Sequence, residues 1–460
     1  MPVSPLFPAD NWWNLDVHAV TADAAQTTLF LAFVSGNAGR QLHPDFGGDV
    51  DPGNSPDVYG FVYFTVPGTQ PRVTVTFPDS NYDQESDHGW PGVPAGYPIP
   101  PAAIDGVHWV ETGNPANQVP VGPDHNGDRH MLIVDKDNRL LYELYHARYN
   151  TTLHRWETSS VDNAGDPDPS GSGAIFPLDS NFRRPDTWTS ADAGGLAILP
   201  GLVRYDEAYG TQPIKHALRV TLHGSNGYVW PASHAAGSNS AALPMGARLR
   251  LKAAVNPIFP GGTAQVDKDA VNRIVQAMKT YGLIMADNGS DMYISGVYDA
   301  RWDNGILNPA FGSLHAGDFE VLPLGWKPTE PAPGGPYLFY PLTPCRLMDT
   351  RNAPGLLGAP KLTANVPRSI PSTVTCGIPT DAQALSVNVT AVTPPATGSL
   401  RLYPGNFTTI PNTSALSFSA GKTRANNAIV ALATGGSGTI AAVSSITGLD
   451  VVIDVNGYFK

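Results

Sequence analysis

The sequence predicts a mainly β protein: a β-sandwich or jelly-roll-like body with few helices, followed by a smaller C-terminal β-sandwich module. The chain has 460 residues, and single cores stop growing at roughly 250–300 residues, so more than one core is expected. Its 47 Gly and 44 Pro exceed the usual share, which favours short strands joined by tight turns. Short apolar runs recur along the chain, whereas one segment stands out with the period of an amphipathic helix.

A proline-rich stretch marks the boundary between the two predicted parts. The stretch from Trp326 to Pro336 contains four prolines and two glycines, and prolines disfavour both helix and central strand while favouring an extended spacer. We therefore predict a catalytic or binding body over residues 1–326, a linker over 327–336 and an accessory module over 337–460.

Within the body, alternating or apolar runs predict the strands. A hairpin is expected from His130–Val134 and Leu140–His146, and a second one from Leu283–Ala286 and Met292–Val297, joined by a type I′ turn at Asn288-Gly289. Apolar residues at helical spacing predict a helix over Asp267–Tyr281 that packs on the sheet and stops at Gly282. The other predicted strands are Tyr59–Val66, Val73–Phe77, His216–Leu222 and Ala247–Ala253.

Composition indicates an extracellular protein. Charged residues make up only 15% and the formal net charge is −12, which disfavours a nucleic-acid partner. No run of eighteen apolar residues predicts a membrane span, and the N-terminus lacks the charged and apolar regions of a signal peptide, so an exported form would already have lost its signal. The two cysteines, Cys345 and Cys376, favour one disulfide in an oxidising compartment, with two buried thiols as the alternative.

No strong catalytic motif is present, so candidate residues come from local concentrations of polar and aromatic side chains. The first concentration runs from Asp128 to His146. Glu143 lies among apolar and aromatic residues, which raises a carboxyl pKa by desolvation and suits a general acid. The alternative is an ion pair across the hairpin with Arg129 or Arg139. His130 is a further catalytic candidate, and Arg129 and Tyr145 are candidate substrate-binding residues.

The second concentration runs from Arg183 to Glu207 and contains two separated carboxylates. Asp192 lies among small residues that permit close approach, Asp206 follows, and Trp188 offers a ring for sugar stacking. Paired carboxylates near an aromatic ring suit glycoside hydrolysis. The alternative is that both carboxylates only cap helices or close turns.

The third concentration offers histidine, arginine and aromatic residues that could neutralise a uronate and abstract a proton, as a polysaccharide lyase requires. The alternative is that each histidine is only a satisfied hydrogen-bonding residue. No metal site is predicted among the histidines and no cofactor is expected, although the acidic stretches Asp79–Glu85 and Asp124–Asp128 suit a structural calcium ion. The residues of the third concentration are His216, Arg219, Trp230 and His234.

Several motifs resemble those of known secreted bacterial proteins. In the body they resemble one family of such proteins, which implies a secreted setting and a boundary near Trp326 but no activity or catalytic residue. In the C-terminal part they resemble a module that recurs at the end of otherwise unrelated secreted bacterial proteins. The body motifs are Gly127–His130, Leu141–Tyr145, Thr189–Ala193, Leu199–Glu207, His216–Arg219 and Ala286–Ser290, and the module motifs are Pro344–Arg351, Asn388–Thr390 and Asp454–Phe459.

These observations predict a secreted, carbohydrate-active protein that binds a polysaccharide or glycan. The leading hypothesis is a glycoside hydrolase in which Glu143 acts with Asp192 or Asp206. A polysaccharide lyase is one alternative. The other is a non-enzymatic glycan-binding or surface protein, in which Trp and Tyr stack on sugars. The module has neither His nor Trp, so it is not expected to contribute to the chemistry.

Overall fold

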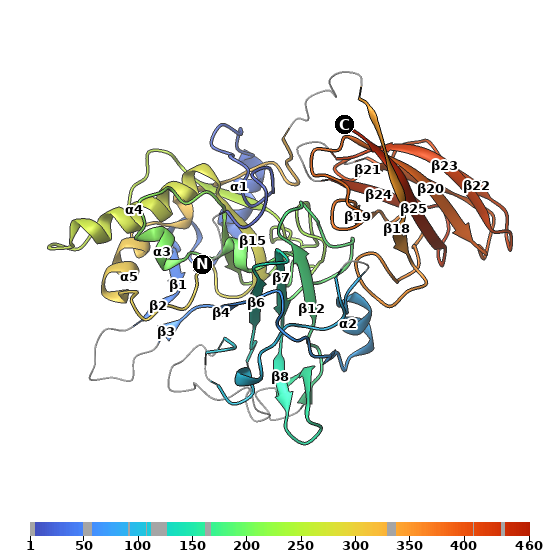
Figure 1. Cartoon of the computed structure of the whole chain (residues 1–460). Helices are drawn as coiled ribbons and strands as arrows, with labels where there is room; N and C mark the ends of the chain where they lie inside the picture. Colours follow the sequence, from blue (N-terminus) through green and yellow to red (C-terminus); the bar gives the residue numbers. More distant parts are fainter. Residues whose placement is uncertain are drawn as a thin grey trace.

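The computed structural model describes residues 5–48, 58–90, 93–106, 108–111, 127–161, 167–328, 337–407, 409–433 and 438–460. Most of the predicted linker, residues 329–336, lies outside this set. The protein is mainly β, with several sheets that form a body and a second module, as the sequence predicts (Figure 1). Within the described ranges, no helix combines the length and the apolar character needed to cross a membrane.

A six-stranded mixed sheet forms one half of the body. β13 lies in its middle and pairs parallel with β15 and antiparallel with β16. In sheet order the strands are β1 (His43–Asp45), β16 (Tyr293–Ser295), β13 (Leu218–Leu222), β15 (Leu283–Asn288), β14 (Arg248–Leu251) and β17 (Phe319–Val321).

The predicted amphipathic helix is confirmed as α4 (Gln265–Thr280), which packs against β14. Its apolar stripe, which includes Val271, Ile274 and Met278, is buried. The helix stops at Gly282, which adopts φ +79°, a conformation that costs glycine little because it has no Cβ.

The predicted hairpin at Asn288-Gly289 is wrong. β15 and β16 do not pair with each other, because β13 lies between them and Thr221 faces both strands. Gly289 donates its backbone N–H to Leu222 O at 2.9 Å, so the turn closes onto β13 rather than onto its own partner strand. The Asn-Gly turn signal is local, so it holds no information about a third strand that comes from about 70 residues earlier in the chain.

The second half of the body is a four-stranded sheet whose central strands are buried throughout. The predicted hairpin is confirmed, because β6 and β7 pair antiparallel from Met131–Leu144 to Asp135–Leu140. Burial on both faces explains why these strands are nearly continuous apolar runs. In sheet order the strands are β12 (Gly173–Pro177), β7 (Leu140–Leu144), β6 (Met131–Asp135) and β4 (Tyr63–Val66).

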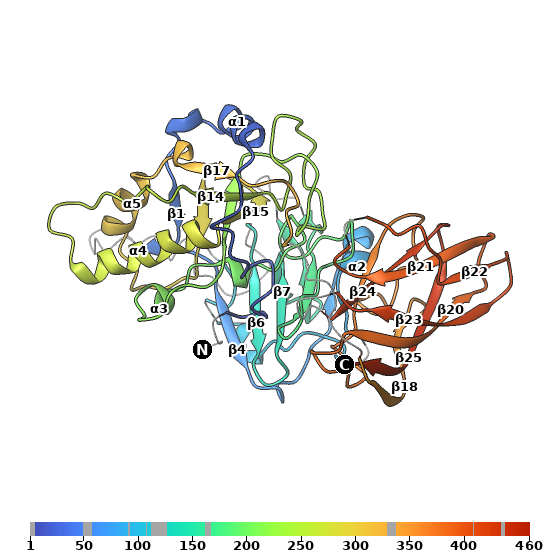
Figure 2. The same ribbon diagram turned by 90° about the horizontal axis from the view of Figure 1, so that it is seen from above.

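Smaller elements complete the body. Helices α3, α4 and α5 lie on the side of the body away from the module, and the β4–β6–β7–β12 sheet lies between them and the module (Figures 1 and 2). The helices are α1 (Ala24–Phe33), α2 (Ser80–Glu85), α3 (Tyr205–Ala208), α5 (Asn304–Gly312) and the 3₁₀ turns η1 (Asn37–Gly39), η2 (Pro101–Ala103), η4 (Leu199–Gly201) and η5 (Ala316–Asp318). The remaining strands are β2 (Gly47–Gly48), β3 (Val58–Tyr59), β5 (Val75–Thr76), β8 (Ala147–Asn150), β9 (Arg155–Thr158), β10 (Ser160–Val161) and β11 (Pro167–Asp168).

The module consists of two four-stranded antiparallel sheets. Residues of β20 alternate strictly between half-buried and buried positions, as expected for a strand with one face on a sandwich core. One sheet has the order β18 (Phe339–Asp349), β25 (Asp450–Phe459), β20 (Ala384–Val392), β23 (Arg424–Ala431). The other has the order β19 (Arg368–Pro371), β24 (Thr439–Ser444), β21 (Gly398–Pro404), β22 (Leu416–Phe418).

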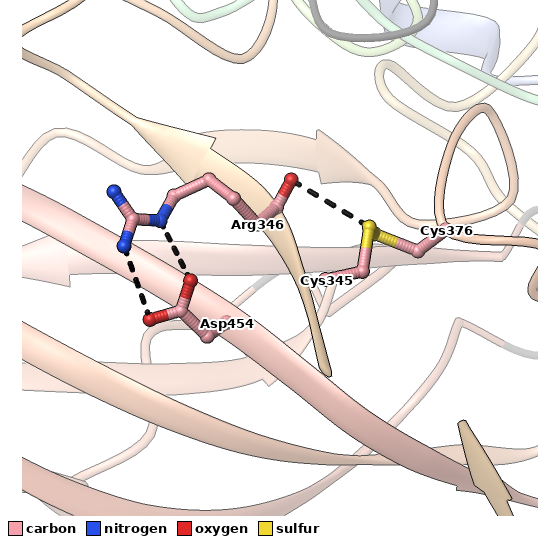
Figure 3. The surroundings of a disulfide bond; sticks show 4 residues. All are labelled: Cys345, Arg346, Cys376 and Asp454. Atoms are coloured by element: carbon pink, nitrogen blue, oxygen red, sulfur yellow. Dashed lines mark hydrogen bonds and ion pairs between the residues drawn. A yellow bond between two sulfur atoms is a disulfide. The ribbon is translucent and has the colours of Figure 1, made fainter. Parts of the chain in front are cut away.

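The predicted disulfide is confirmed. Cys345 on β18 is bonded to Cys376, which follows β19, with 5.6 Å between the two Cα atoms (Figure 3). The bond therefore joins the two sheets of the module. The neighbouring Arg346 turns away from it and pairs with Asp454 on β25 at 2.6 Å.

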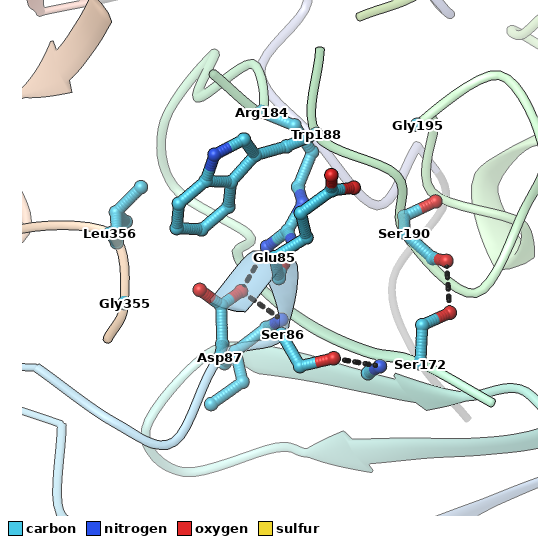
Figure 4. Close-up of polar contacts among 12 residues, drawn as sticks. Glu85, Ser86, Asp87, Ser172, Arg184, Trp188, Ser190, Gly195, Gly355 and Leu356 are labelled. Carbon is cyan, nitrogen blue, oxygen red and sulfur yellow. Dashed lines mark hydrogen bonds and ion pairs between the residues drawn. The ribbon is translucent and has the colours of Figure 1, made fainter. Parts of the chain in front are cut away.

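The module contacts the body through a loop over residues 352–360. Arg368 organises this loop by donating to several of its carbonyls, among them Gly355 O at 3.0 Å. Leu356 is fully buried and lies beside Trp188 of the body (Figure 4). A Cβ on Gly355 would come within 2.7 Å of Gly89 O, so the two backbones are in close contact.

Candidate functional site

Seven charged residues gather where the two sheets of the body meet, and we refer to them as the junction cluster. They come from six separate stretches of the chain, including β1, β13, β15 and the segment that leads into β6. Four of the body motifs singled out in the sequence contribute a residue to it, and Tyr145 of a fifth motif packs on His130. The members are Asp45, Glu111, Asp128, His130, Asp192, Arg219 and Asp287.

Arg219 on β13 is the centre of the cluster. Its guanidinium donates to both oxygens of Asp192 at 3.0 and 2.8 Å and to Asp287 Oδ2 at 2.6 Å. It also donates to Ser295 Oγ at 2.9 Å. Burial lowers the pKa of Arg219, but the carboxylates Asp192 and Asp287 outweigh burial and raise it overall. The guanidinium is therefore a fixed positive charge with its nitrogens committed to protein groups.

The register of the sheet places Asp45 and Arg219 on the same face. Asp45 on β1 is opposite Ser295 on β16, and cross-strand partners point to the same side of a sheet. Ser295 in turn accepts from Arg219. Since Asp287 comes from β15 on the other side of β13, Asp45 and Asp287 flank Arg219 from opposite directions.

His130 links the cluster to the four-stranded sheet. Its Nε2 lies 3.0 Å from Ala191 O and its Nδ1 lies 2.6 Å from Glu111 Oε2. Burial lowers the pKa of His130, but the Glu111 carboxylate outweighs it and raises the pKa to about 9. The ring is held between Phe61 at 5.0 Å and Tyr145 at 5.3 Å, measured between ring centroids.

The cluster has a buried floor and an accessible rim. Asp192, Arg219 and His130 are buried. Asp128 is exposed, and the side chains of Glu111 and Asp287 keep 23% and 24% of their surface accessible. Groups on the rim can therefore meet a solute, while groups on the floor hold them in place.

Asp45 on the rim has an environment that favours its protonated form. Burial raises its pKa, the negative charge of Glu111 raises it further, and Arg219 opposes both, with a net increase. Asp287, on the other side of Arg219, accepts directly from the guanidinium. Carboxyl groups whose surroundings differ in this way are typical of acid–base pairs.

Glu143, the leading candidate from the sequence, is fully buried beneath this cluster. Its oxygens accept the backbone N–H groups of Ile198 and Leu199 at 2.9–3.0 Å, so it caps the start of η4. Burial raises its pKa to about 8 against these hydrogen bonds, as its apolar neighbours predict. The ion pairs proposed as its alternative role are not formed within the described residues. Its contacts indicate a structural role.

The structure brings Asp192, His130 and Arg219 together and places Asp206 and His216 elsewhere. Asp206 is exposed on α3 and pairs with Arg301 at 3.1 Å. His216 is buried beside Glu207, with 3.3 Å between Nε2 and Oε2.

Of the candidate substrate-binding residues, Arg219 is a member of the cluster, and Tyr145 and His234 contact a member or the backbone beside one. Tyr145 packs on His130, and His234 Nδ1 lies 2.8 Å from Ala193 O, next to Asp192. Arg129 is buried and donates to Ala147 O at 3.2 Å. Trp188 is buried against Leu356, and Trp230 packs edge-on against Trp12 with centroids 6.3 Å apart.

Sequence reasoning missed Asp45, Glu111 and the role of Asp287. Asp287 lies within a motif that was singled out, Ala286–Ser290, so its position carried a signal. Asp45 lies on a three-residue strand and Glu111 lies outside the described strands, so neither had a pattern that could distinguish it from a surface carboxylate.

The two acidic stretches proposed to bind calcium have different surroundings in the structure. Asp79 caps the short helix α2 by accepting from Asn81 N and Tyr82 N, which accounts for it without an ion. Of the second stretch, residues 124–126 lie outside the described residues. Its last residue, Asp128, lies close to Glu111 and His130, and one ligand atom from each of the three lies within 4.8 Å of the others.

Comparison with known proteins adds little to this geometry. No protein-family model matches the chain, and no curated protein matches it. Two similar solved structures are of the Tobacco streak virus coat protein, one described as a dimer. They are 12% and 14% identical, with TM-scores of 0.17 and 0.16, and the matches cover 26% of this chain and 85% of each coat-protein chain. At such TM-scores they carry no argument about fold or function.

Proposed function

We propose that the protein is a secreted, carbohydrate-active hydrolase whose reaction takes place at the rim of the junction cluster. The observation that supports this most is the placement of two carboxyl groups, Asp45 and Asp287, on either side of Arg219. Asp45 has a raised pKa and is suited to protonate a leaving oxygen. Asp287, held by Arg219 at 2.6 Å, is suited to act as the base or nucleophile.

Hydrolysis is better supported than elimination by a lyase. A lyase needs a free cation for the uronate and a base to abstract the proton. The guanidinium of Arg219 is already shared among Asp192, Asp287 and Ser295. His130 holds Glu111 and Ala191 O with its two ring nitrogens, so neither group is available for these roles.

A purely glycan-binding role through tryptophan stacking has weaker support. Trp188 is buried against the module loop, and an indole covered on its face cannot pack on a sugar ring. A secreted setting is supported by the Cys345–Cys376 disulfide, since such bonds persist in oxidising compartments, and by the low share of charged residues.

The test is a screen of soluble polysaccharides for released reducing ends, repeated with Asp45→Asn and Asp287→Asn. Loss of a general acid typically costs a factor of about 10²–10⁴ in rate, and we expect a loss in this range for Asp45→Asn. Asp16→Asn is the matched control, because Asp16 is an exposed carboxylate outside the cluster, and it should keep full activity.

Each alternative has its own outcome in the same screen. Turnover that survives in both variants would remove the junction cluster from the mechanism. New ultraviolet absorbance from an unsaturated product would indicate a lyase. Saturable binding of a glycan without turnover would indicate a binding protein. Folding of each variant is checked by tryptophan emission.

A further inference from the structure

Glu111, Asp128 and His130 form a compact group on the accessible side of the junction cluster. One ligand atom from each lies within 4.8 Å of the other two. The group combines an imidazole nitrogen with two carboxylates, and in the sequence Glu111 is separated from the other two by more than fifteen residues. The fold thus assembles a ligand set that no spacing in the sequence could show.

The orientation of His130 is that of a metal ligand. A carbonyl oxygen only accepts hydrogen bonds, so the contact of 3.0 Å with Ala191 O places a proton on Nε2. Nδ1 then points at Glu111. Histidines that bind metals usually donate their other ring N–H to a carbonyl or carboxylate in this way, which fixes the tautomer and the ring. Phe61 and Tyr145 hold the buried ring from two sides.

Charge and access also suit a cation. Once the ion displaces the Nδ1 proton of His130, the two carboxylates and the neutral imidazole carry a charge of −2, which a divalent ion neutralises. The nearby guanidinium of Arg219 does not compete, because Asp192 and Asp287 already accept from it. Asp128 is exposed and Glu111 is partly exposed, so an ion has a path from solvent.

The distances between the three ligand atoms need only small adjustments to hold an ion. Two ligands of a tetrahedral zinc ion at about 2.0 Å lie about 3.3 Å apart. The 2.6 Å contact between His130 and Glu111 would open slightly when the ion replaces the proton between them. The ligand atoms lie within 4.8 Å of one another, so the exposed Asp128 side chain would move inward by up to about 1.5 Å to reach this spacing.

We propose that Glu111, Asp128 and His130 bind a divalent transition-metal ion, Zn²⁺ or Mn²⁺, and leave further coordination positions to water or substrate oxygens. Mixed nitrogen and carboxylate ligands suit these ions, whereas Ca²⁺ prefers oxygen ligands throughout. Three protein ligands with an open position are typical of catalytic rather than structural zinc sites. If the proposed hydrolysis holds, the ion would lie beside the reacting groups, but binding can be measured without turnover.

The experiment is calorimetric titration of the metal-free full-length protein with ZnCl₂, MnCl₂ and CaCl₂. We expect one Zn²⁺ or Mn²⁺ per chain, bound at least tenfold more tightly than Ca²⁺. Asp128→Asn and Glu111→Gln should each weaken binding at least tenfold. Asp128 is exposed, so its variant should fold normally, and an unchanged tryptophan-monitored melt without metal checks this.

Asp16→Asn is the matched control. Asp16 and His18 form an exposed carboxylate–histidine pair with 2.7 Å between Oδ1 and Nδ1, so the same kind of pair is tested outside the cluster, and its loss should leave the affinity unchanged. The proposal is overturned if no ion binds stoichiometrically, if both cluster variants keep wild-type affinity, or if Ca²⁺ binds as tightly as Zn²⁺. A failure of hydrolysis with intact metal binding would count against the proposed function alone.

Discussion

Replacing Arg219 by methionine tests the central interaction of the junction cluster. The substitution keeps much of the side-chain volume but removes the guanidinium, which leaves the fully buried carboxylate of Asp192 without its ion-pair partner. Breaking a buried ion pair by removing one partner typically costs about 3–5 kcal/mol. The unfolding entropy is about 2.1 cal/mol/K per residue, so for a body of roughly 320 residues this corresponds to a drop in Tm of about 4–7 °C.

Tryptophan emission is a selective assay for this effect. The nine tryptophans of the chain all lie at or before Trp326, so the emission reports unfolding of the body and not of the module. Arg301→Met is the control, since Arg301 pairs with Asp299 and Asp206 at the surface and its side chain is 54% exposed. Exposed pairs contribute at most about 1 kcal/mol, so its Tm should change by less than about 2 °C.

The double variant Asp192→Leu/Arg219→Met sharpens the test. Replacing both charges by apolar groups removes the stranded carboxylate, so part of the lost Tm should return. If Arg219→Met lowers the Tm no more than Arg301→Met does, the buried pair does not hold the cluster together. The assignment of Arg219 as its organising residue would then be wrong.

Three further predictions concern pH, the module and its contact with the body. Glu143, whose pKa burial raises from 4.5 to about 8, contributes stability that is present below pH 4.5 and lost as the pH rises through 8. Burial lowers the pKa of His130 but Glu111 raises it overall from 6.5 to about 9, so His130 contributes stability that is lost as the pH rises through 9. The tryptophan-monitored Tm should therefore fall between pH 6 and 9, and it should fall less in Glu143→Gln. A wild-type Tm that stays flat or rises over this range would contradict the prediction. The Cys345–Cys376 disulfide closes a loop of 31 residues, so its reduction should destabilise the module by about 4 kcal/mol. This loss should appear in melts followed by circular dichroism, while the tryptophan-monitored melt of the body is unchanged. Equal shifts in both signals would show that the two parts unfold together. Leu356→Asp should lower the free energy of unfolding by at least the roughly 1.5–3 kcal/mol of a buried leucine and shift the emission of Trp188 to longer wavelength. The control Leu338→Asp, at a leucine that is 67% exposed, should change neither the stability nor the emission. An unshifted emission in Leu356→Asp would mean that the loop does not cover Trp188 in solution.

The sequence predicted the elements whose signals are local. The apolar stripe of α4 and its stop at Gly282 are both present, because a helix is set by residues three and four apart. The β6–β7 hairpin is also present, because its two strands follow each other in the chain and are joined by a short turn. The sequence also predicted the raised pKa of Glu143, since its apolar neighbours on the strand already indicate burial.

The sequence by itself therefore determined that this protein is mainly β and that it has a second module with one disulfide. It also identified His130, Asp192 and Arg219 as candidate site residues. Only the tertiary structure decided that β13 enters between β15 and β16. It also decided that Arg219 meets Asp192 and Asp287, while Glu143 accepts from the backbone N–H groups of Ile198 and Leu199. Asp45 and Glu111 became visible only then. The physical reason is that the energy of a buried charge depends on which distant group neutralises it, and contacts between residues far apart in the chain leave no period in the sequence.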